Sequence, residues 1–257
     1  MTVIGLQFDI AWENKPANFA TVRRLLTAAQ PEKNSLVVLP EMFATGFSMN
    51  ASAMAEPYGG ETEQFLKEIA GEFGVWMLGG ATMRGRDGRA RNKCLVFAPT
   101  GELKAFYTKM RLFTPGGESG HFVSGEQLVS FLWQDCVVCP FICYDLRFPE
   151  LFRKAMTMQK PELFIVIANF PKKRIHHWVR LLQARAVENQ AYVVGVNRIG
   201  SDPIQSYPGR SLIIDPEGEI LADAGENENV IRAELNISML RQYREKLPFL
   251  SDMKELG

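Results

Sequence analysis

The sequence has no excess of positive or negative charge, no long apolar run and few cysteines. Its 29 lysines and arginines are balanced by 29 aspartates and glutamates. Nucleic acids and anionic membranes attract basic surfaces, so this balance argues against both as partners. The one basic run, Lys172-Lys173-Arg174, is too short to change that conclusion. No apolar stretch approaches the ~18 residues that a membrane-spanning helix needs.

Cysteine usage and the opening residues bear on the compartment. Four cysteines are too few for a disulfide framework in a chain of 257 residues, which favours a reducing environment. The opening stretch MTVIGLQFDIAW lacks a basic segment and reaches Asp9 too early for a secretory signal peptide. We therefore expect a cytoplasmic protein that acts on a small molecule.

Short apolar runs rich in Val, Ile and Phe alternate with amphipathic stretches along the whole chain. The runs are typical of buried strands, and an apolar residue every three or four positions is typical of helices. The pattern predicts helices at residues 16–29, 61–73, 149–159 and 176–190. It predicts strands at residues 3–9, 36–40, 75–83, 93–99, 103–109, 136–143, 163–169, 191–198, 211–215, 219–223 and 230–235.

Two segments repeat one pattern. VFAPTGELKA (96–105) and IIDPEGEILA (213–222) both contain apolar-apolar-x-Pro-x-Gly-Glu-apolar. Pro and Gly at those offsets fit a tight turn between antiparallel strands. Two β-rich halves, each with two helices, predict an α/β fold in which two sheets pack face to face with helices outside. This is a four-layer αββα sandwich with an internal pseudo-twofold. No linker-like segment divides residues 1–257, so one domain is expected.

Three of the predicted strands end in reactive side chains. Glu41 follows LVVLP, Lys109 follows LKAFYT, and Cys143 follows CPFI. Ligands of open α/β sheets bind beyond the carboxyl ends of strands, which makes these positions candidates for a site. Each residue alone also has an ordinary interpretation: a loop carboxylate, a solvated amine and a buried thiol.

Together these side chains supply the parts for cleaving a carbon–nitrogen bond through a covalent intermediate. A free thiol has a pKa of about 8.5, so Cys143 needs a base or a nearby cation to become a nucleophile. Glu41 can take the thiol proton and later give it to a departing amine. Lys109 and the backbone N–H of Tyr144 can stabilise the oxyanion that forms when sulfur attacks an amide carbonyl.

Longer motifs around these residues resemble one family, the nitrilase-like carbon–nitrogen hydrolases. The motifs are LVVLPEMFATGF, FYTKMRLF, FICYDLRFPEL and LLQARAVENQAYVVGVNRIG, and the resemblance covers nearly the whole chain. Within the family, the sequence is most similar to the ω-amidase branch, because it contains ANFPKKRIHHW followed by LLQARAVENQAYVVGVNRIG. Members of that branch hydrolyse α-ketoglutaramate and α-ketosuccinamate. The resemblance implies an αββα sandwich, usually dimeric, with a Glu–Lys–Cys triad at Glu41, Lys109 and Cys143. We expect no cofactor and no metal.

Further site residues are expected from the same resemblance and from the substrate it implies. A second family glutamate, which orients the lysine and the substrate, falls on Glu118, although the surrounding PGGESGH departs from the usual family wording. A keto-acid amide carries a carboxylate, and Arg174 and His177 of PKKRIHHW are expected to bind it. The pocket walls are expected to come from aromatic residues near the triad: Phe43, Phe47, Phe113 and Tyr144. The tail, about residues 236–257, is expected to fasten a homodimer.

Other interpretations of the same residues stay open at this point. Cys136, Cys139 and Cys143 form C-x₂-C-x₃-C, a spacing found in metal sites, although metal-binding turns are rich in Gly and this segment is an apolar run. His177 offers an alternative base, which would make the protein a Cys–His hydrolase. Related enzymes with the triad cut aliphatic amides, N-carbamoyl amines or nitriles. Inactive scaffold subunits would lack a triad residue, and all three are present in this sequence.

Overall fold

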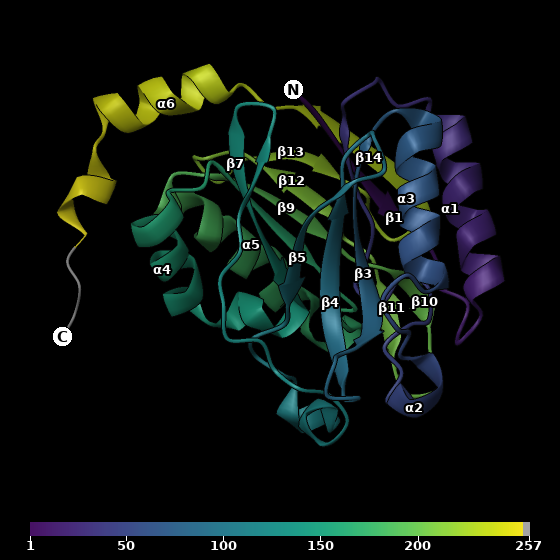
Figure 1. Ribbon diagram of the computed structural model, residues 1–257. Helices are drawn as coiled ribbons and strands as arrows, with labels where there is room; N and C mark the ends of the chain where they lie inside the picture. The colour runs from purple at the N-terminus through teal and green to yellow at the C-terminus, as the bar shows by residue number, and fades with distance from the viewer. Residues whose placement is uncertain (254–257) are drawn as a thin grey trace.

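The computed structural model describes residues 1–253, which form two six-stranded sheets packed face to face (Figure 1). The first sheet has the order β14-β1-β2-β3-β4-β5. Its strands are β1 (Thr2–Gln7), β2 (Leu36–Val38), β3 (Trp76–Arg84), β4 (Ala90–Phe97), β5 (Leu103–Thr108) and β14 (Asn229–Glu234). The second has the order β13-β12-β9-β8-β7-β6. Its strands are β6 (Phe131–Trp133), β7 (Cys136–Ile142), β8 (Leu163–Ile167), β9 (Tyr192–Val196), β12 (Leu212–Ile214) and β13 (Ile220–Asp223).

Helices cover the outer face of each sheet (Figure 1). The first sheet carries α1 (Lys15–Ala29) and α3 (Glu61–Phe73), and the second carries α4 (Pro149–Gln159) and α5 (Ile175–Asn189). The predicted αββα sandwich is therefore confirmed. Two shorter helices, α2 (Ala51–Met54) and α6 (Ile237–Lys246), and a ribbon of β10 (Ile199–Ser201) with β11 (Ser206–Pro208) lie outside these four layers.

The central strands are apolar throughout because both of their faces are buried. In β1, Val3 packs in the same apolar cluster as Val138 of the second sheet. The next residue, Ile4, packs in a different cluster with Leu26 of α1. Side chains of a strand alternate between its faces, so one face meets the opposite sheet and the other meets a helix. This arrangement explains the continuous apolar runs in the sequence.

The two sheets repeat one topology. An antiparallel edge strand precedes three parallel strands, and two antiparallel strands follow, in the orders β14-β1-β2-β3-β4-β5 and β6-β7-β8-β9-β12-β13. The repeated sequence pattern forms the last hairpin of each sheet. The N–H of Ala98 donates to the carbonyl of Glu102 over 2.9 Å, and the N–H of Asp215 donates to Glu219 over the same distance. The predicted hairpin repeat is confirmed.

The structure differs from the sequence prediction mainly in short elements. The sequence pattern did not indicate α2, β6, β10 or β11, because segments of three or four residues are too short to show a period. The strand predicted to run through Cys143 ends at Ile142. The tail contains α6, and its last residues, 254–257, lie outside the described residues. Among residues 1–253, no helix combines the length and the apolar character needed to cross a membrane.

Candidate active site

The nucleophile candidate lies where a buried strand turns into a 3-10 helix. β7 ends at Ile142, and Cys143 opens the helix with a φ of 48°, in the left-handed region. A residue with a side chain is strained there, and such strain recurs at functional sites. The buried carboxylate of Asp145 stabilises this turn. It accepts hydrogen bonds from the N–H of Ile142 at 3.0 Å, the N–H of Arg111 at 2.8 Å and the hydroxyl of Tyr107 at 2.8 Å.

Glu41 follows β2 and is fully buried. Its backbone passes so close to β3 that a Cβ at Gly80 would lie 2.6 Å from the Cα of Glu41 and 2.4 Å from the nitrogen of Met42. Real Cβ atoms do not approach backbone this closely, so glycine at position 80 is a condition for placing Glu41 here.

Lys109 follows β5 and is also fully buried. Its Nζ lies 2.9 Å from Oε1 of Glu41 and 2.9 Å from Oε2 of Glu118. Burial alone lowers the pKa of this ammonium, but the two carboxylates outweigh burial and hold the pKa above its ordinary value. The lysine therefore stays charged. Phe47 covers the ammonium, with its ring centroid 5.2 Å from Nζ.

Glu118 is the second carboxylate that contacts Lys109. Its Oε2 accepts the N–H of Phe113 at 2.6 Å and also faces Lys109. Its Oε1 accepts from Nζ of Lys109 at 3.1 Å and from Nδ2 of Asn92 at 3.0 Å. Three hydrogen bonds and one ion pair thus tie Glu118 to Lys109, Asn92 and the loop at Phe113. Glu118 can therefore hold Lys109 in place.

Glu41 is held by hydrogen bonds from both sheets, and it also faces the thiol. Its Oε1 accepts from Lys109 at 2.9 Å and from Nδ2 of Asn92 at 2.7 Å. Its Oε2 accepts the backbone N–H of Asn169 at 2.9 Å. The side-chain amide of Asn169 lies 3.4 Å from the same oxygen but donates chiefly to the carbonyl of Glu41, at 2.7 Å. Oε1 therefore carries two strong donors and Oε2 only one. Of the two carboxylates, Glu41 acts more strongly on the Cys143 thiol and lies within its hydrogen-bonding reach, so Glu41 is the carboxylate placed to accept its proton.

The Cys143 thiol lies under the influence of both Glu41 and Lys109. Burial raises the pKa of the thiol well above its usual range, the carboxylate of Glu41 raises it further, and the ammonium of Lys109 opposes the rise. The resting sulfur is thus a neutral thiol beside the carboxylate of Glu41. This arrangement suits proton transfer to Glu41 as the sulfur attacks.

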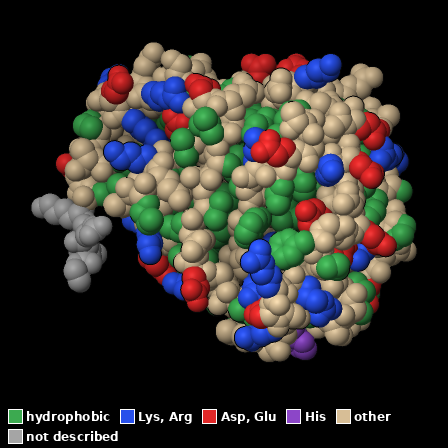
Figure 2. Space-filling view, viewed as in Figure 1, with side chains coloured by type: hydrophobic (Ala, Val, Ile, Leu, Met, Phe, Trp, Pro, Cys, Tyr) green, Lys and Arg blue, Asp and Glu red, His purple; other side chains and the backbone are tan. Residues whose placement is uncertain are grey.

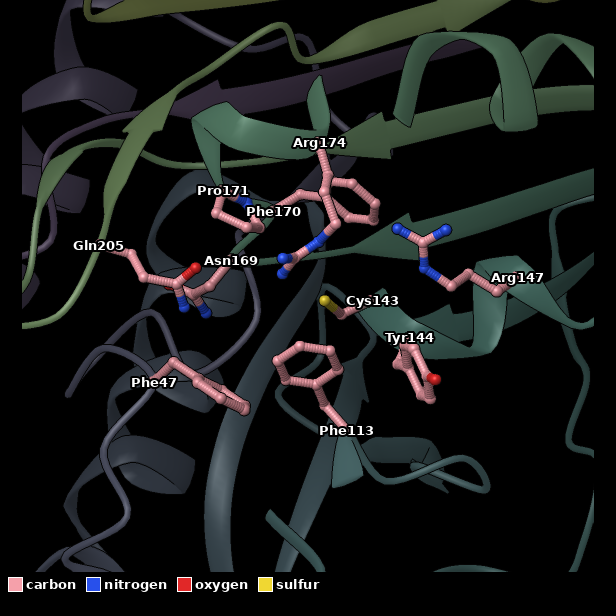
Figure 3. A pocket seen from close by; sticks show the side chains of 10 residues that line it. All are labelled: Phe47, Phe113, Cys143, Tyr144, Arg147, Asn169, Phe170, Pro171, Arg174 and Gln205. Atoms are coloured by element: carbon pink, nitrogen blue, oxygen red, sulfur yellow. The ribbon is translucent and has the colours of Figure 1, made fainter. Parts of the chain in front are cut away.

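A pocket opens in front of the thiol (Figure 3). Its lining residues are Phe47, Phe113, Cys143, Tyr144, Arg147, Asn169, Phe170, Pro171, Arg174 and Gln205. Tyr144 lies in the first turn of the 3-10 helix, where backbone N–H groups lack intrahelical acceptors and can face a ligand. Phe43 does not line the pocket: its ring is fully buried between Phe19 and Phe65, with centroids 6.1 Å from each. The wall position expected for Phe43 belongs to Phe47, since the chain turns between them.

Two guanidinium groups flank the thiol in Figure 3. Arg174 lies over the ring of Phe113 at 5.2 Å, and its side chain makes no hydrogen bond or ion pair to any of residues 1–253. Arg147 lies over Phe170 at 5.5 Å, and within the same range its one hydrogen-bond partner is Nδ1 of His177, at 3.1 Å. Neither arginine has a carboxylate partner among the described residues, so both are available to an anionic ligand.

His177 lies behind Arg147 and does not line the pocket. Partial burial lowers the pKa of its imidazole, and neighbouring His176, Arg147 and Arg174 lower it further. A neutral ring accepts at Nδ1, so His177 orients Arg147 and is not placed to contact a substrate itself. The direct carboxylate contact expected for His177 is therefore not seen, because another cation fills the space between it and the pocket.

The cysteine spacing does not assemble a metal site. Cys136 and Cys139 are fully buried in β7, where burial raises the pKa of both thiols. Across residues 1–253, no group of three or more His, Cys, Asp or Glu side chains has an arrangement that could hold a metal ion. The C-x₂-C-x₃-C pattern follows from strand packing.

Sequence reasoning missed two asparagines that complete the polar network. Asn169 is predicted as the last residue of a strand, but β8 ends at Ile167 and Asn169 lies just beyond it. The rule that located Glu41 beyond a strand end therefore also applies to Asn169. Asn92 is a fully buried polar residue within β4. Its neighbours in β4 are Arg91 and Lys93, so no sequence signal distinguishes it.

The fold agrees with comparisons to known proteins. The sequence pattern of the family described as carbon-nitrogen hydrolase matches residues 3–245. The chain belongs to the carbon–nitrogen hydrolase family. As a member it is a hydrolase acting on carbon–nitrogen bonds other than peptide bonds, and its substrate is a small amide.

Relatives within this family extend over nearly the whole hydrolase. The omega-amidase YafV of Yersinia enterocolitica is 38% identical over 251 residues, 96% of this chain and 94% of the relative. The 2-oxoglutaramate amidase of Bacillus subtilis is 32% identical over 255 residues, 99% of this chain and 98% of the relative. The crystal structure of XC1258 from Xanthomonas campestris, a CN-hydrolase superfamily protein, has an arsenic adduct in its active site. It is 30% identical, with a TM-score of 0.94 over 100% of this chain and 98% of that one.

Proposed function

We propose that this hydrolase cleaves the terminal amide of a small α-keto acid amide, α-ketoglutaramate or α-ketosuccinamate, to the dicarboxylate and ammonia. The observation that carries the proposal is one pocket that combines the Cys143 thiol with the guanidinium groups of Arg147 and Arg174, neither of which has a carboxylate partner within residues 1–253. A keto-acid amide has a scissile amide at one end and a carboxylate at the other, which matches this arrangement. Relatives at 38% and 32% identity are named omega-amidase and 2-oxoglutaramate amidase.

The reaction proceeds through a thioester on Cys143. The thiol proton passes to Oε2 of Glu41 while sulfur attacks the amide carbon, and the oxyanion is stabilised by Lys109 and the N–H of Tyr144. Glu41 then gives its proton to the amide nitrogen, the carbon–nitrogen bond breaks, and ammonia leaves. A water molecule gives a proton to Glu41 and attacks the thioester. The carbon–sulfur bond breaks, and the sulfur recovers the proton from Glu41.

The experiment that tests the substrate assignment is a panel with ammonia release as its readout. It compares α-ketoglutaramate and α-ketosuccinamate with hexanamide, N-carbamoyl amines and nitriles. We expect the two keto-acid amides to have the highest kcat/KM. A preference for hexanamide or an N-carbamoyl amine would instead assign the enzyme to another amidase activity of the same family.

We further propose that residues 1–257 form one hydrolase domain that assembles as a homodimer in the cytoplasm. All four cysteines are free thiols, as a reducing compartment favours. Within one chain α6 is fastened by Arg241, whose Nε donates to Glu162 at 2.6 Å, while Met239 and Phe249 remain exposed. Apolar side chains also gather over β5 in the middle of the face shown in Figure 2. Light scattering at micromolar concentration tests the dimer, and a fully active monomer would refute it.

A further inference from the structure

Asn92 contacts both carboxylates of the site, although the reaction above gives it no step. Its fully buried Nδ2 donates to Oε1 of Glu41 at 2.7 Å and to Oε1 of Glu118 at 3.0 Å. Carboxylate oxygens of ionised side chains only accept, so these contacts fix which end of the amide carries the hydrogens. Both hydrogens of the amide are committed to the two carboxylates.

Asn92 bridges the same pair of carboxylates as Lys109. Two carboxylates in a site closed to water repel each other, and one ammonium neutralises only one of their charges. Asn92 adds two donors to the pair without adding charge, and so holds the two carboxylates together beside Lys109. The two bridges are also joined through the backbone, since the N–H of Lys109 donates to the carbonyl of Asn92 at 2.9 Å.

The oxygen of the Asn92 amide destabilises the fold. Its Oδ1 is buried without a hydrogen-bond partner among the described residues, and so is Oγ1 of Thr82, which is its cross-strand partner in β3. A buried polar atom without a partner is unfavourable. The contribution of Asn92 therefore lies in what its Nδ2 does to Glu41 and Glu118.

We propose that Asn92 is a positioning residue of the reaction, which holds Glu41 and Glu118 together beside Lys109 and directs the Cys143 proton to Oε2 of Glu41. Asn92 and Lys109 both donate to Oε1 of Glu41, so the thiol proton is received by Oε2. This inference rests on the proposed function, in which Glu41 is the base. It holds for any amide substrate, because it concerns the proton and not the far end of the ligand.

The experiment compares Asn92→Ala with a matched control, Asn189→Ala. Asn189 on α5 is also fully buried, its Nδ2 donates to the carbonyl of Arg185 at 2.9 Å, and its Oδ1 likewise lacks a partner among residues 1–253. Both variants remove a buried amide, but Asn189 lies outside the pocket lining. The measurements are kcat and kcat/KM across pH, with the folded fraction of each variant determined by urea unfolding.

We expect Asn92→Ala to lower kcat at least about tenfold per folded molecule, the scale of one hydrogen bond to a charged group. The acid limb of its kcat/KM profile should move to higher pH, because losing a donor disfavours the ionised base. Asn92→Asp, which places a third carboxylate against Glu41 and Glu118, should lose more activity than the alanine variant. Asn189→Ala should keep the wild-type profile.

Two results would overturn the inference, and a second variant separates it from the proposed function. If Asn92→Ala keeps the wild-type profile and loses activity only in proportion to unfolding, as the control does, Asn92 is purely structural. Wild-type activity in Asn92→Asp would have the same meaning. Glu41→Gln reports on the proposed function: an inactive Glu41→Gln beside a normal Asn92→Ala refutes the inference alone, whereas an active Glu41→Gln refutes both.

Discussion

The backbone N–H of Asn169 donates to Oε2 of Glu41 over 2.9 Å, although the residues are 128 positions apart. Glu41 follows β2 of the first sheet, and Asn169 follows β8 of the second. The bond therefore joins the candidate base to the sheet that carries Cys143. Because backbone is the donor, the distance between base and nucleophile is set by the packing of the two sheets and not by a flexible side chain.

Cys143→Ala is expected to abolish ammonia release, because the variant has no nucleophile. The fold should remain, since the change removes only the sulfur from a residue at the strand end. Intact mass spectrometry should detect an acyl adduct on the wild type during turnover and none on the variant. Wild-type-like ammonia release from Cys143→Ala would end the thioester mechanism.

Lys109→Ala should lower kcat by on the order of a hundredfold or more, if the ammonium stabilises the oxyanion. The variant also leaves Glu41 and Glu118 buried without their cation, so its folded fraction must be measured alongside. Lys109→Arg should fail as well, because a planar guanidinium cannot replace a compact ammonium in a fully buried site. An active arginine variant would show that charge alone is sufficient.

Glu41→Gln and His177→Ala distinguish the two candidate bases. Glu41→Gln should be inactive, since an amide cannot accept the thiol proton. His177→Ala should keep most of kcat and raise KM, because its contact is with Arg147 and not with the pocket. Steady-state kinetics on α-ketoglutaramate distinguishes the two bases. An active Glu41→Gln beside an inactive His177→Ala would favour a Cys–His hydrolase.

Arg174→Ala should reduce kcat/KM for α-ketoglutaramate by about 1.5–3 kcal/mol, the contribution of a hydrogen bond to a charged group. Most of the loss should appear in KM. Hexanamide has no carboxylate, so its kinetics should hardly change and provide the internal control. Equal losses on both substrates would mean that Arg174 supports the pocket wall through Phe113 instead of binding the carboxylate.

Asp145 should make stability depend on pH. Burial raises the pKa of this carboxyl from 3.8 to about 6, so the folded protein holds its proton more tightly than the unfolded chain. The resulting stabilisation is complete below about pH 4 and is lost as the pH rises through about 6. Asp145→Asn cannot titrate. The unfolding free energy of the wild type, relative to this variant, should fall by about 3 kcal/mol between about pH 4 and pH 7. Urea unfolding across that range measures the difference, and a constant difference would contradict the prediction.

Local sequence determined the layers of the fold. Apolar runs, amphipathic stretches and the repeated Pro-x-Gly turns identified the long strands, the four covering helices and both terminal hairpins, because these features depend on neighbours within a few residues. The same rules placed Glu41 and Cys143 beyond the ends of the parallel strands β2 and β7, and Lys109 beyond the end of the antiparallel strand β5.

Tertiary structure alone decided what those side chains can do. Glu41 and Glu118 are both carboxylates beside Lys109, and only the neighbours around each, with the Cys143 thiol beside Glu41, separate a base from a holder. Those donors come from Asn92, Phe113 and Asn169, which different strands and loops deliver. The set of hydrogen bonds around each carboxylate is a property of the assembled site, because the packing of the two sheets brings together donors that are far apart in the sequence. No local pattern in the chain encodes it.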